Sequence, residues 1–290
     1  MIPYLKGKTI IVTGATSGIG FAVAEEAAKS GAYVVGIGRS REKCEEAENR
    51  IKKLWADSKI HYLLADFTSL NQIRSLAKNI NQLLSAENRH CIDVLINSAG
   101  SVSSWYKETS DGFELQFAVN HLAPFLLTHE LLPLLEKSPS GRIITVSSNS
   151  HYKTRINFND IMNRKHYNIL MAYKRSKLAN VLFTAEFNRR YGSHSKVRAF
   201  AADPGLVNTS IGTKGTFGLA KWFWNMQAKR GDDPHVPAKA ILFIAGDPSV
   251  SNSREIYWKN CKPQKPSAYS LREDAAAKLW EFSAKACGIK

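Results

Sequence analysis

Short runs of apolar and β-branched residues alternate along the chain with longer segments in which apolar residues recur at helical spacing. The short runs have the length of buried strands, and the longer segments have the pattern of amphipathic helices. This pattern predicts strands over 9–14, 33–39, 60–66, 93–100, 141–148, 196–205 and 254–260, and helices over 18–29, 41–55, 70–85, 112–136, 170–191, 235–246 and 272–286.

The alternation of strands and helices also predicts how they pack. Helices that connect parallel strands cross over with a right hand and cover both faces of the sheet. The first six predicted strands are apolar nearly throughout, as strands buried on both faces should be. No repeat or linker interrupts the sequence, so we predict one α/β domain over 1–290, with a doubly wound parallel seven-stranded sheet and helices on both faces.

The net charge limits the kinds of binding partner to expect, and the cysteine content indicates the redox state of the compartment. The formal charge of +15 favours acidic ligands, nucleic acid or an anionic membrane surface. The basic residues are scattered and come without a zinc-finger or RNA-reading motif, so we expect no nucleic-acid partner. The four cysteines form no CxxC pair, which predicts reduced thiols in a cytosol-like compartment; they are Cys44, Cys91, Cys261 and Cys287.

Nothing in the sequence predicts export or a membrane span. The first residues, MIPYLKGKTIIVTG, lack the charged leader and apolar core of a signal peptide. The longest apolar-rich stretch, 122–135, is 14 residues long and contains His129 and Glu130, which makes it too short and too polar to cross a bilayer. We therefore predict a soluble, cytoplasmic protein, with peripheral membrane contact left open.

The first predicted strand runs into the sequence TGATSGIG, residues 13–20, directly before a helix. Its glycines let the backbone turn tightly and approach a pyrophosphate, while the helix N-terminus offers free N–H groups and a positive dipole. The spacing is GxxxGxG rather than GxGxxG, but strand, turn and helix follow in the required order. We predict a Rossmann fold whose turn binds a dinucleotide through Gly14, Thr16, Ser17, Gly18, Ile19 and Gly20.

The end of the second predicted strand indicates which dinucleotide. A site for NAD(H) has Asp or Glu there for the ribose 2′-hydroxyl. This chain has Arg39 and Ser40 instead, a guanidinium and a hydroxyl that suit a 2′-phosphate. We therefore favour NADP(H) over NAD(H), and interpret Glu42 as first-turn helix charge.

Further motifs, taken in order, resemble those of a known family. They are TGATSGIG, Asp66 after the third strand, NSAG at 97–100, Asn120, VSS at 146–148, Tyr173 with Lys177, and PGLVNT at 204–209. Together they resemble the short-chain dehydrogenases/reductases of the classical subfamily, over essentially the whole chain. Three stretches resemble its retinol dehydrogenase-like reductases more narrowly: NHLAPFLLTHELLPLL, YKRSKLANVLFTAEFNRR and the tail IYWKNCK with AAAKLWEFS.

Tyr173 and Lys177 form the chemical centre of the sequence AYKRSK. Carbonyl reduction needs a hydride and a proton, and an unperturbed tyrosine is a poor acid/base at neutral pH. An ammonium four residues later on the same helix face favours the phenolate, so we expect Lys177 to lower the pKa of Tyr173. Lys174 and Arg175 point elsewhere on the helix and are interpreted as solvent-facing, while Ser176 is interpreted as a packing residue.

The resemblance adds roles that the residues alone do not give. It implies that Lys177 also binds the nicotinamide ribose, that Asn120 completes a proton relay, and that Ser148 rather than Ser147 holds the substrate oxygen, as an oxyanion-hole donor does. It assigns Asp66 and the following Phe67 to the adenine. Further cofactor contacts implied in this way are Asn97, Ala99 and Gly100 near the adenine ribose, and Pro204, Gly205, Val207 and Thr209 at the nicotinamide. The family usually has Asn-Asn-Ala-Gly where this chain has Ser98 in second place, which puts local stabilisation of the sheet in doubt.

The substrate end is described less well by the sequence. The region 206–233 falls where the family builds its substrate lid, and its aromatic side chains have two equal interpretations, core packing of a helix or an apolar substrate wall. Aromatic rings beside Lys221 could also rest on a membrane surface. The aromatic residues are Phe217, Trp222, Phe223 and Trp224.

These observations favour an NADP(H)-dependent carbonyl reductase or alcohol dehydrogenase acting on an apolar aldehyde, ketone or alcohol. A non-catalytic NADP(H)-sensing protein of the same fold is the alternative, and a basic adaptor for nucleic acid or membranes is a third. The family often forms dimers or tetramers, so a homo-oligomer is expected. No metal is expected, because the histidines show no metal-binding spacing; those considered are His121, His129, His151 and His166.

Overall fold

The computed structural model describes residues 2–207, 231–251 and 253–289. Its centre is one sheet in the order β3-β2-β1-β4-β5-β6-β7-β8, in which β1 to β7 are parallel. The seven-stranded parallel sheet is thus confirmed, and a two-residue antiparallel strand extends it at β7. The strands are β1 (Thr9–Thr13), β2 (Tyr33–Gly38), β3 (Lys59–Leu64), β4 (Val94–Asn97), β5 (Arg142–Val146), β6 (Arg198–Asp203), β7 (Tyr257–Lys259) and β8 (Lys262–Pro263).

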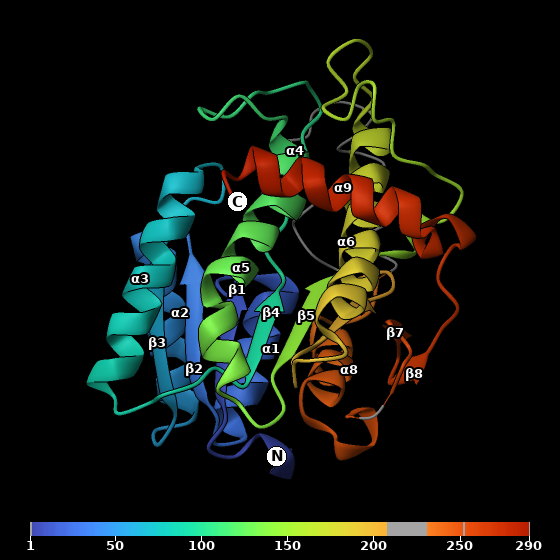
Figure 1. Ribbon diagram of the computed structural model, residues 1–290. Helices are drawn as coiled ribbons and strands as arrows, with labels where there is room; N and C mark the ends of the chain where they lie inside the picture. The colour runs from blue at the N-terminus through green and yellow to red at the C-terminus, as the bar shows by residue number, and fades with distance from the viewer. Residues whose placement is uncertain (1, 208–230, 252, 290) are drawn as a thin grey trace.

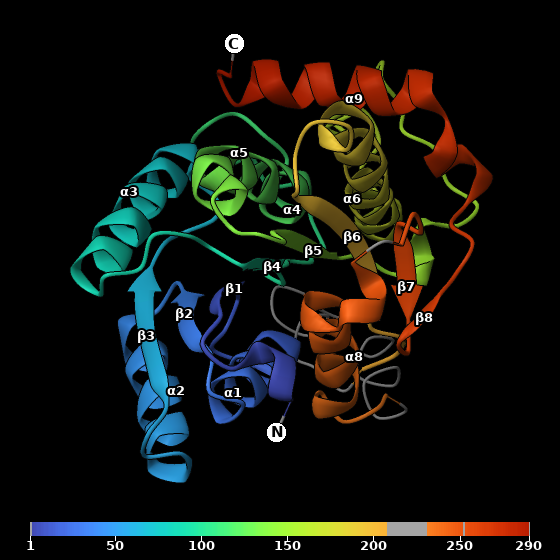
Figure 2. The same cartoon turned by 60° about the horizontal axis from the view of Figure 1, so that its bottom comes forward.

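Helices cover both faces of the sheet, as predicted (Figure 1). On one face lie α3, α5 and α6, with α9 outside them, and on the other lie α1, α2 and α8 (Figure 2). The helices are α1 (Gly18–Lys29), α2 (Arg41–Leu54), α3 (Leu70–Ala86), α4 (Leu115–Phe117), α5 (Ala123–Glu136), α6 (Ile169–Tyr191), α8 (His235–Gly246) and α9 (Glu273–Ala286). Shorter helical turns are η1 (Pro3–Leu5), η2 (Ala118–Leu122), η3 (Asn149–His151), η5 (Pro248–Val250) and η6 (Ala268–Leu271).

The two hydrophobic cores follow from the alternation of side chains along each strand. In β1, Ile10 packs into the core under α1 and α8, while its neighbour Ile11 packs into the core under α3, α5 and α6. The strand β3 departs from the predicted burial, because it lies at the edge of the sheet. Only Ile60 of its six residues is buried, and both of its ends are exposed.

The segment predicted as one helix over 112–136 is interrupted. A π-helical turn, η2, separates α4 from α5 and contains Asn120. Glu114 begins the segment by accepting hydrogen bonds from the backbone N–H groups of Gln116 (2.9 Å) and Phe117 (2.8 Å). Such turns widen a helix locally and are frequent at functional sites.

The helix α9 covers aromatic side chains of α5 and α6. Trp280 stacks on Phe183 with ring centroids 5.8 Å apart and meets Phe125 edge to face at 5.0 Å. Arg190 of α6 forms a 2.6 Å ion pair with Glu281 of α9. The homo-oligomer stays a prediction, and the aromatic side chains that α9 buries are not exposed for such an interface.

Arg142 connects the start of β5 to the end of α8. Its buried guanidinium donates to the carbonyls of Ile244 (2.6 Å) and Asp247 (2.9 Å) and to Ser251 Oγ (2.7 Å). These acceptors include carbonyls of the last helical turn, which carries negative partial charge. Burial lowers the pKa of Arg142, and Asp247 acts in the opposite direction.

We expect Arg142→Ala to lower the free energy of unfolding by about 2–4 kcal/mol, because it leaves buried carbonyl groups without their donor. Denaturant titration followed by circular dichroism measures this loss. The exposed Arg41, at the start of α2, is the control, and Arg41→Ala should change stability by less than about 0.5 kcal/mol. Equal stabilities for the two variants would contradict the assigned role of Arg142.

Candidate active site

A pocket of about 810 Å³ opens at the carboxyl ends of the parallel strands. Its lining includes residues that directly follow β1, β2, β4, β5 and β6 together with residues of α6. Ligands of open α/β sheets bind in this position, where the strand order reverses between β1 and β4. The pocket therefore collects segments that are far apart in the sequence.

The glycine turn forms one end of the pocket. Gly14 has φ of +69°, and a Cβ there would lie 2.9 Å from Ala99 Cα. A Cβ on Gly20 would lie 2.3 Å from the carbonyl oxygen of Gly14. Tyr62 supports the turn from β3 by donating to the carbonyl oxygen of Ala15 at 2.8 Å. The turn and the start of α1 line the pocket with Gly14, Thr16, Ser17, Gly18, Ile19 and Gly20, all of them predicted.

The next two strands contribute polar and apolar groups. Arg39 is exposed and lines the pocket, whereas Ser40 does not; its hydroxyl caps α2 by accepting from Lys43 N at 3.4 Å. The contact of Ser40 with a 2′-phosphate stays a prediction. After β3, Asp66 and Phe67 line the pocket, and the carboxylate of Asp66 accepts from the N–H and the hydroxyl of Thr68, both at 2.9 Å.

The sequence NSAG after β4 is divided between the pocket and the interior. Ala99 and Gly100 line the pocket, but Asn97 is buried behind it and donates to Thr128 Oγ1 at 3.3 Å. Ser98 also lines the pocket, and the N–H groups of Ser98 and Ala99 donate to Thr13 Oγ1 at 3.0 Å. The amide nitrogen of Asn97 is thus bonded to Thr128, and the contact of Asn97 with a cofactor stays a prediction.

Asn120 is buried and does not line the pocket. Its side-chain oxygen accepts from Ser101 N at 2.7 Å, and its amide donates to Ser101 O and Ser176 Oγ, both at 3.0 Å. These contacts join η2 to the loop after β4 and to α6. The expected packing role of Ser176 is confirmed, since it is fully buried and also donates to Tyr173 O at 2.8 Å.

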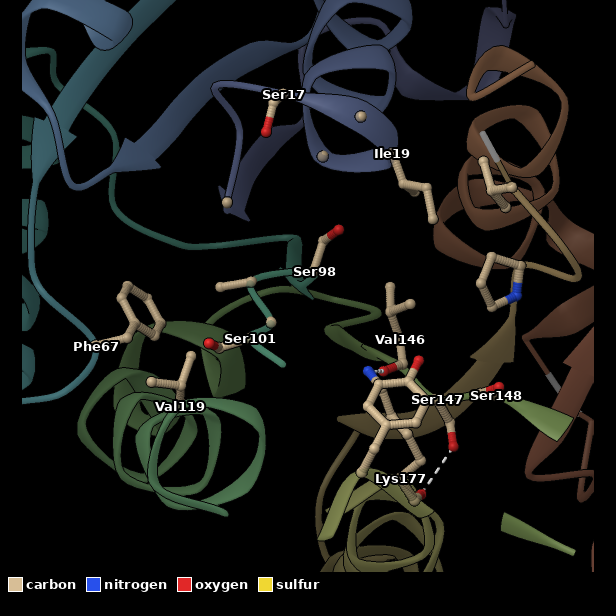
Figure 3. A pocket seen from close by; sticks show the side chains of 18 of the residues that line it. Ser17, Ile19, Phe67, Ser98, Ser101, Val119, Val146, Ser147, Ser148 and Lys177 are labelled. Carbon is tan, nitrogen blue, oxygen red and sulfur yellow. Dashed lines mark hydrogen bonds between the residues drawn. The ribbon is translucent and has the colours of Figure 1, made fainter. Parts of the chain in front are cut away.

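Tyr173, Lys177 and Ser148 meet in the pocket, as predicted. Lys177 Nζ lies 5.6 Å from the centroid of the Tyr173 ring and donates to Val146 O at 2.9 Å (Figure 3). Ser148 forms a side-chain hydrogen bond with Tyr173. The neighbouring Ser147 is buried, and its hydroxyl donates to the backbone carbonyl of Lys177 at 2.8 Å. Ser148 is thus the serine of the pair that faces Tyr173.

The proton affinities of this pair differ from the expectation. Burial raises the pKa of Tyr173 to about 12; the hydrogen bond with Ser148 opposes this, and the charge of Asp203 adds to it. Burial lowers the pKa of Lys177 to about 8, and Asp203 opposes that change. The pKa of Tyr173 is thus raised rather than lowered as expected, because removal from water disfavours the phenolate and outweighs any stabilisation of it by Lys177.

Lys174 and Arg175 do not form the solvated face that their charges predicted. Lys174 is half-buried and lines the pocket. Arg175 is also half-buried; it donates to Asn163 Oδ1, and burial lowers its pKa. The loop over 149–168 packs against α6 and covers this part of the helix, which the helix sequence alone could not show.

The segment after β6 completes the pocket. Pro204, Gly205 and Val207 line it, and Gly205 has φ of +73°. Thr209 lies outside the described residues, and so do Phe217, Lys221, Trp222, Phe223 and Trp224 of the expected lid over 206–233.

The pocket also contains apolar residues that were not singled out from the sequence. Their spacing offered a signal, because Leu115 and Val119 lie four residues apart on a predicted helix and Leu170 lies one turn before Tyr173. Figure 3 shows Val119 beside Phe67, away from Lys177 and Ser148. Leu170 and Leu206 are exposed at the pocket lining. Missed lining residues include Leu115, Val119, Leu170, Leu206, Thr68, Ser101, Asn149 and Ser150.

Histidines do not line this pocket. His121 is buried and lies 2.8 Å from Ser283 Oγ, and burial lowers its pKa to about 4. His151 is also fully buried, while His129 and His166 are exposed. Among the described residues, no three His, Cys, Asp or Glu side chains are grouped so that they could hold a metal ion.

Comparisons with known proteins agree with this geometry. Residues 8–216 match the family described as short chain dehydrogenase. The chain is 35% identical to mouse retinol dehydrogenase 14 over 98% of its own length and 87% of that protein, and 35% identical to human retinol dehydrogenase 13 over 99% and 86%.

Solved structures give the same fold. A crystal structure of an uncharacterized protein from Mycobacterium paratuberculosis is similar with a TM-score of 0.76 and 30% identity, over 99% of this chain and 96% of that one. A protein described as a short chain dehydrogenase from Shigella flexneri, solved in complex with NADP, is similar with a TM-score of 0.69 and 22% identity, over 90% of this chain and all of that one, 100%.

The two neighbouring serines should differ in their effect on stability. Ser147→Ala removes a buried hydrogen bond and should lower the free energy of unfolding by about 1 kcal/mol. Ser148 is only half-buried, so Ser148→Ala should cost less than about 0.5 kcal/mol. Denaturant titration of both variants measures the difference, and a larger loss for Ser148→Ala would contradict the separation of roles.

Proposed function

This chain belongs to the short-chain dehydrogenase/reductase family, and from that premise we propose that it is an NADP(H)-dependent oxidoreductase, a carbonyl reductase or alcohol dehydrogenase for apolar substrates. The observation that carries the proposal is the meeting of the glycine turn, Ser148, Tyr173 and Lys177 in one pocket. A nucleotide site at one end and a proton donor at the other suit hydride and proton transfer to a carbonyl group.

The residues of the pocket fit a dinucleotide. Gly14 and Gly20 leave no room for a Cβ, which would clash with the backbone of Ala99 and of Gly14, so the turn can be this tight only with glycine, and the N-terminus of α1 meets the pocket there. Phe67 and Val119 offer apolar surface for a base, as Figure 3 shows. Arg39, exposed at the end of β2, would pair with a 2′-phosphate, which favours NADP(H). The bound nicotinamide would supply or accept the hydride.

Protein groups would handle the proton. A carbonyl oxygen held by the Ser148 hydroxyl would lie next to Tyr173, which donates a proton as the oxygen gains charge. The raised pKa of Tyr173 keeps it protonated at neutral pH, which suits the direction of carbonyl reduction. Lys177, charged below its pKa of about 8, would stabilise the phenolate that remains. Because both polar groups of the Asn120 side chain bond to protein atoms, a relay through that side chain is not part of the proposal.

The substrate is proposed to be an apolar aldehyde or ketone, or the matching alcohol, of the retinal-like, steroid-like or another hydrophobic kind. Leu170 precedes Tyr173 by one helical turn and Leu206 follows Gly205, so both would offer apolar surface near the reacting groups. Two of the relatives carry the name retinol dehydrogenase. No helix in the described part of the chain has the length and apolar character to cross a membrane.

The test of the function is steady-state turnover of NADPH and NADP with retinal, aliphatic aldehydes, ketones, steroids and the matching alcohols. We expect Tyr173→Phe to lower kcat by about 10²–10⁴ and Ser148→Ala by about 10²–10³, because each loses a group acting on the substrate oxygen. Ser147→Ala should retain turnover within a few-fold. Tight NADPH binding without turnover of any carbonyl would instead favour a nucleotide-sensing binding protein.

The choice of nucleotide is tested separately. Arg39→Asp should lower kcat/KM for NADPH by about 10–100-fold, since a charge-assisted contact is lost and a like charge is added. The same change should leave kcat/KM for NADH equal or higher. Arg41→Asp, two residues further on, is the control for net charge. A preference of the unchanged protein for NADH over NADPH would rule out this use of Arg39.

A further inference from the structure

Asp203 is a buried carboxylate directly behind the reacting groups. It is the last residue of β6 and only 4% exposed, and Pro204 and Gly205, which follow it, line the pocket. The neighbouring strand β5 leads to Ser148 and carries Val146, the acceptor of Lys177. The two strands stay paired to this point, since Ser147 N donates to Ala202 O at 2.8 Å.

The carboxylate is held in place from two sides. One oxygen accepts from Gly205 N at 2.9 Å and closes the turn in which Gly205 has positive φ. The other oxygen accepts from the hydroxyl of Tyr257 in β7 at 2.9 Å. Lys259 Nζ lies 4.0 Å from the same oxygen, on a side chain that is 37% exposed. Because water screens Lys259, this ion pair neutralises the buried charge only in part.

Three other titratable side chains near Asp203 carry no charge at neutral pH. His151 is buried; its Nε2 accepts from Ser267 N at 3.1 Å, so Nδ1 carries the proton and donates to Ser148 O at 2.8 Å. Burial lowers the pKa of His151 and raises those of Tyr152 and Tyr257. These three groups are therefore uncharged at neutral pH, and within residues 2–207, 231–251 and 253–289 the charges that remain around Asp203 are those of Lys177 and Lys259.

We propose that Asp203 is a positioning residue of the site, which places a fixed negative charge behind the Tyr173–Lys177 pair and so keeps the pair fully protonated to higher pH. For the pH dependence of turnover the inference rests on the proposed function. The charge of Asp203 raises the pKa of Tyr173 and the pKa of Lys177, and it opposes the effect of burial on Lys177. Reduction uses the protonated pair, whereas oxidation needs Tyr173 as a base.

Asp203→Asn removes this charge and keeps the shape and an oxygen for Gly205 N. It should move the titration of Lys177 to lower pH. It should also move the high-pH limb of the profile of carbonyl reduction to lower pH and reduce NADPH-dependent carbonyl reduction at pH 8 about three- to tenfold, since one pKa unit corresponds to a tenfold change in protonation ratio. The pH profile of kcat/KM for carbonyl reduction measures the second effect.

The first effect is measured without turnover. The protein labelled with ¹³C at lysine Cε is titrated by NMR, with the Lys177 resonance assigned from its loss in Lys177→Arg. Asp247→Asn is the matched control, because Asp247 also accepts from a backbone N–H two residues on, that of Ser249 at 2.9 Å. It lies beside Arg142 at the start of β5, at the opposite end of the strands from Asp203, and should leave the Lys177 titration unchanged.

Lys259→Gln is a second variant, for which the expected shift of the Lys177 titration has the opposite sign. The Lys259 side chain is half-exposed and should not be needed for folding. The substitution removes the partial neutralisation of Asp203 and should move the Lys177 titration to higher pH. The proposal is overturned if the Lys177 titration is unchanged in Asp203→Asn, or if Asp247→Asn shifts it equally. If Asp203→Asn does not fold, the proposal is overturned when Lys259→Gln shifts the Lys177 titration to lower pH or not at all. A titration that responds as stated without reduction of any carbonyl removes the proposed function but leaves the role of Asp203.

Discussion

A lysine ammonium that is buried at the end of a parallel sheet is the constraint on which this site depends. Lys177 is 4% exposed, and its Nζ donates to Val146 O at the last residue of β5. Burial of a charge is tolerated only where hydrogen bonds and nearby charges compensate for lost water. Three neighbouring features help to hold Lys177 in this position or to keep it charged. They are the paired ends of β5 and β6, the hydrogen bond of Ser147 that joins α6 to the end of β5, and the carboxylate of Asp203.

Much of the fold, the glycine turn and the Tyr173–Lys177 pair could be predicted from the sequence, because these features depend on the spacing of nearby residues. The glycine turn needs residues without Cβ atoms at fixed positions, and the structure uses Gly14 and Gly20 in that way. Tyr173 and Lys177 share a helix face because they are four residues apart. The carboxyl ends of parallel strands lie on the same side of the sheet, so segments as far apart in the sequence as Arg39 and Pro204 line one pocket.

Other features could not be predicted, because contacts between distant segments determine them. Asn97 and Asn120 belong to matching motifs, yet Thr128 in one case and Ser101 in the other hold their side chains away from the pocket. Arg175 has the charge of a solvated residue, yet it donates to Asn163 of the loop over 149–168, a contact that the helix sequence does not contain. The edge position of β3 likewise depends on strand order, and strand order is absent from the hydrophobic pattern.

The protonation of Tyr173 shows how these long-range contacts act on the chemistry. Four-residue spacing brings the ammonium of Lys177 near the ring of Tyr173. The ammonium is still 5.6 Å from the ring centroid and donates to Val146 O, so burial has a larger effect on the pKa of Tyr173 than the lysine charge has. The half-buried Tyr173 then keeps its proton, and the buried Lys177 loses one more readily than a lysine in water. Such a pair needs a further charge to stay fully protonated near neutral pH. Asp203, which directly precedes the motif at 204–209 but is not part of it, is placed at the end of β6 to supply that charge, and Tyr257 holds it there from β7.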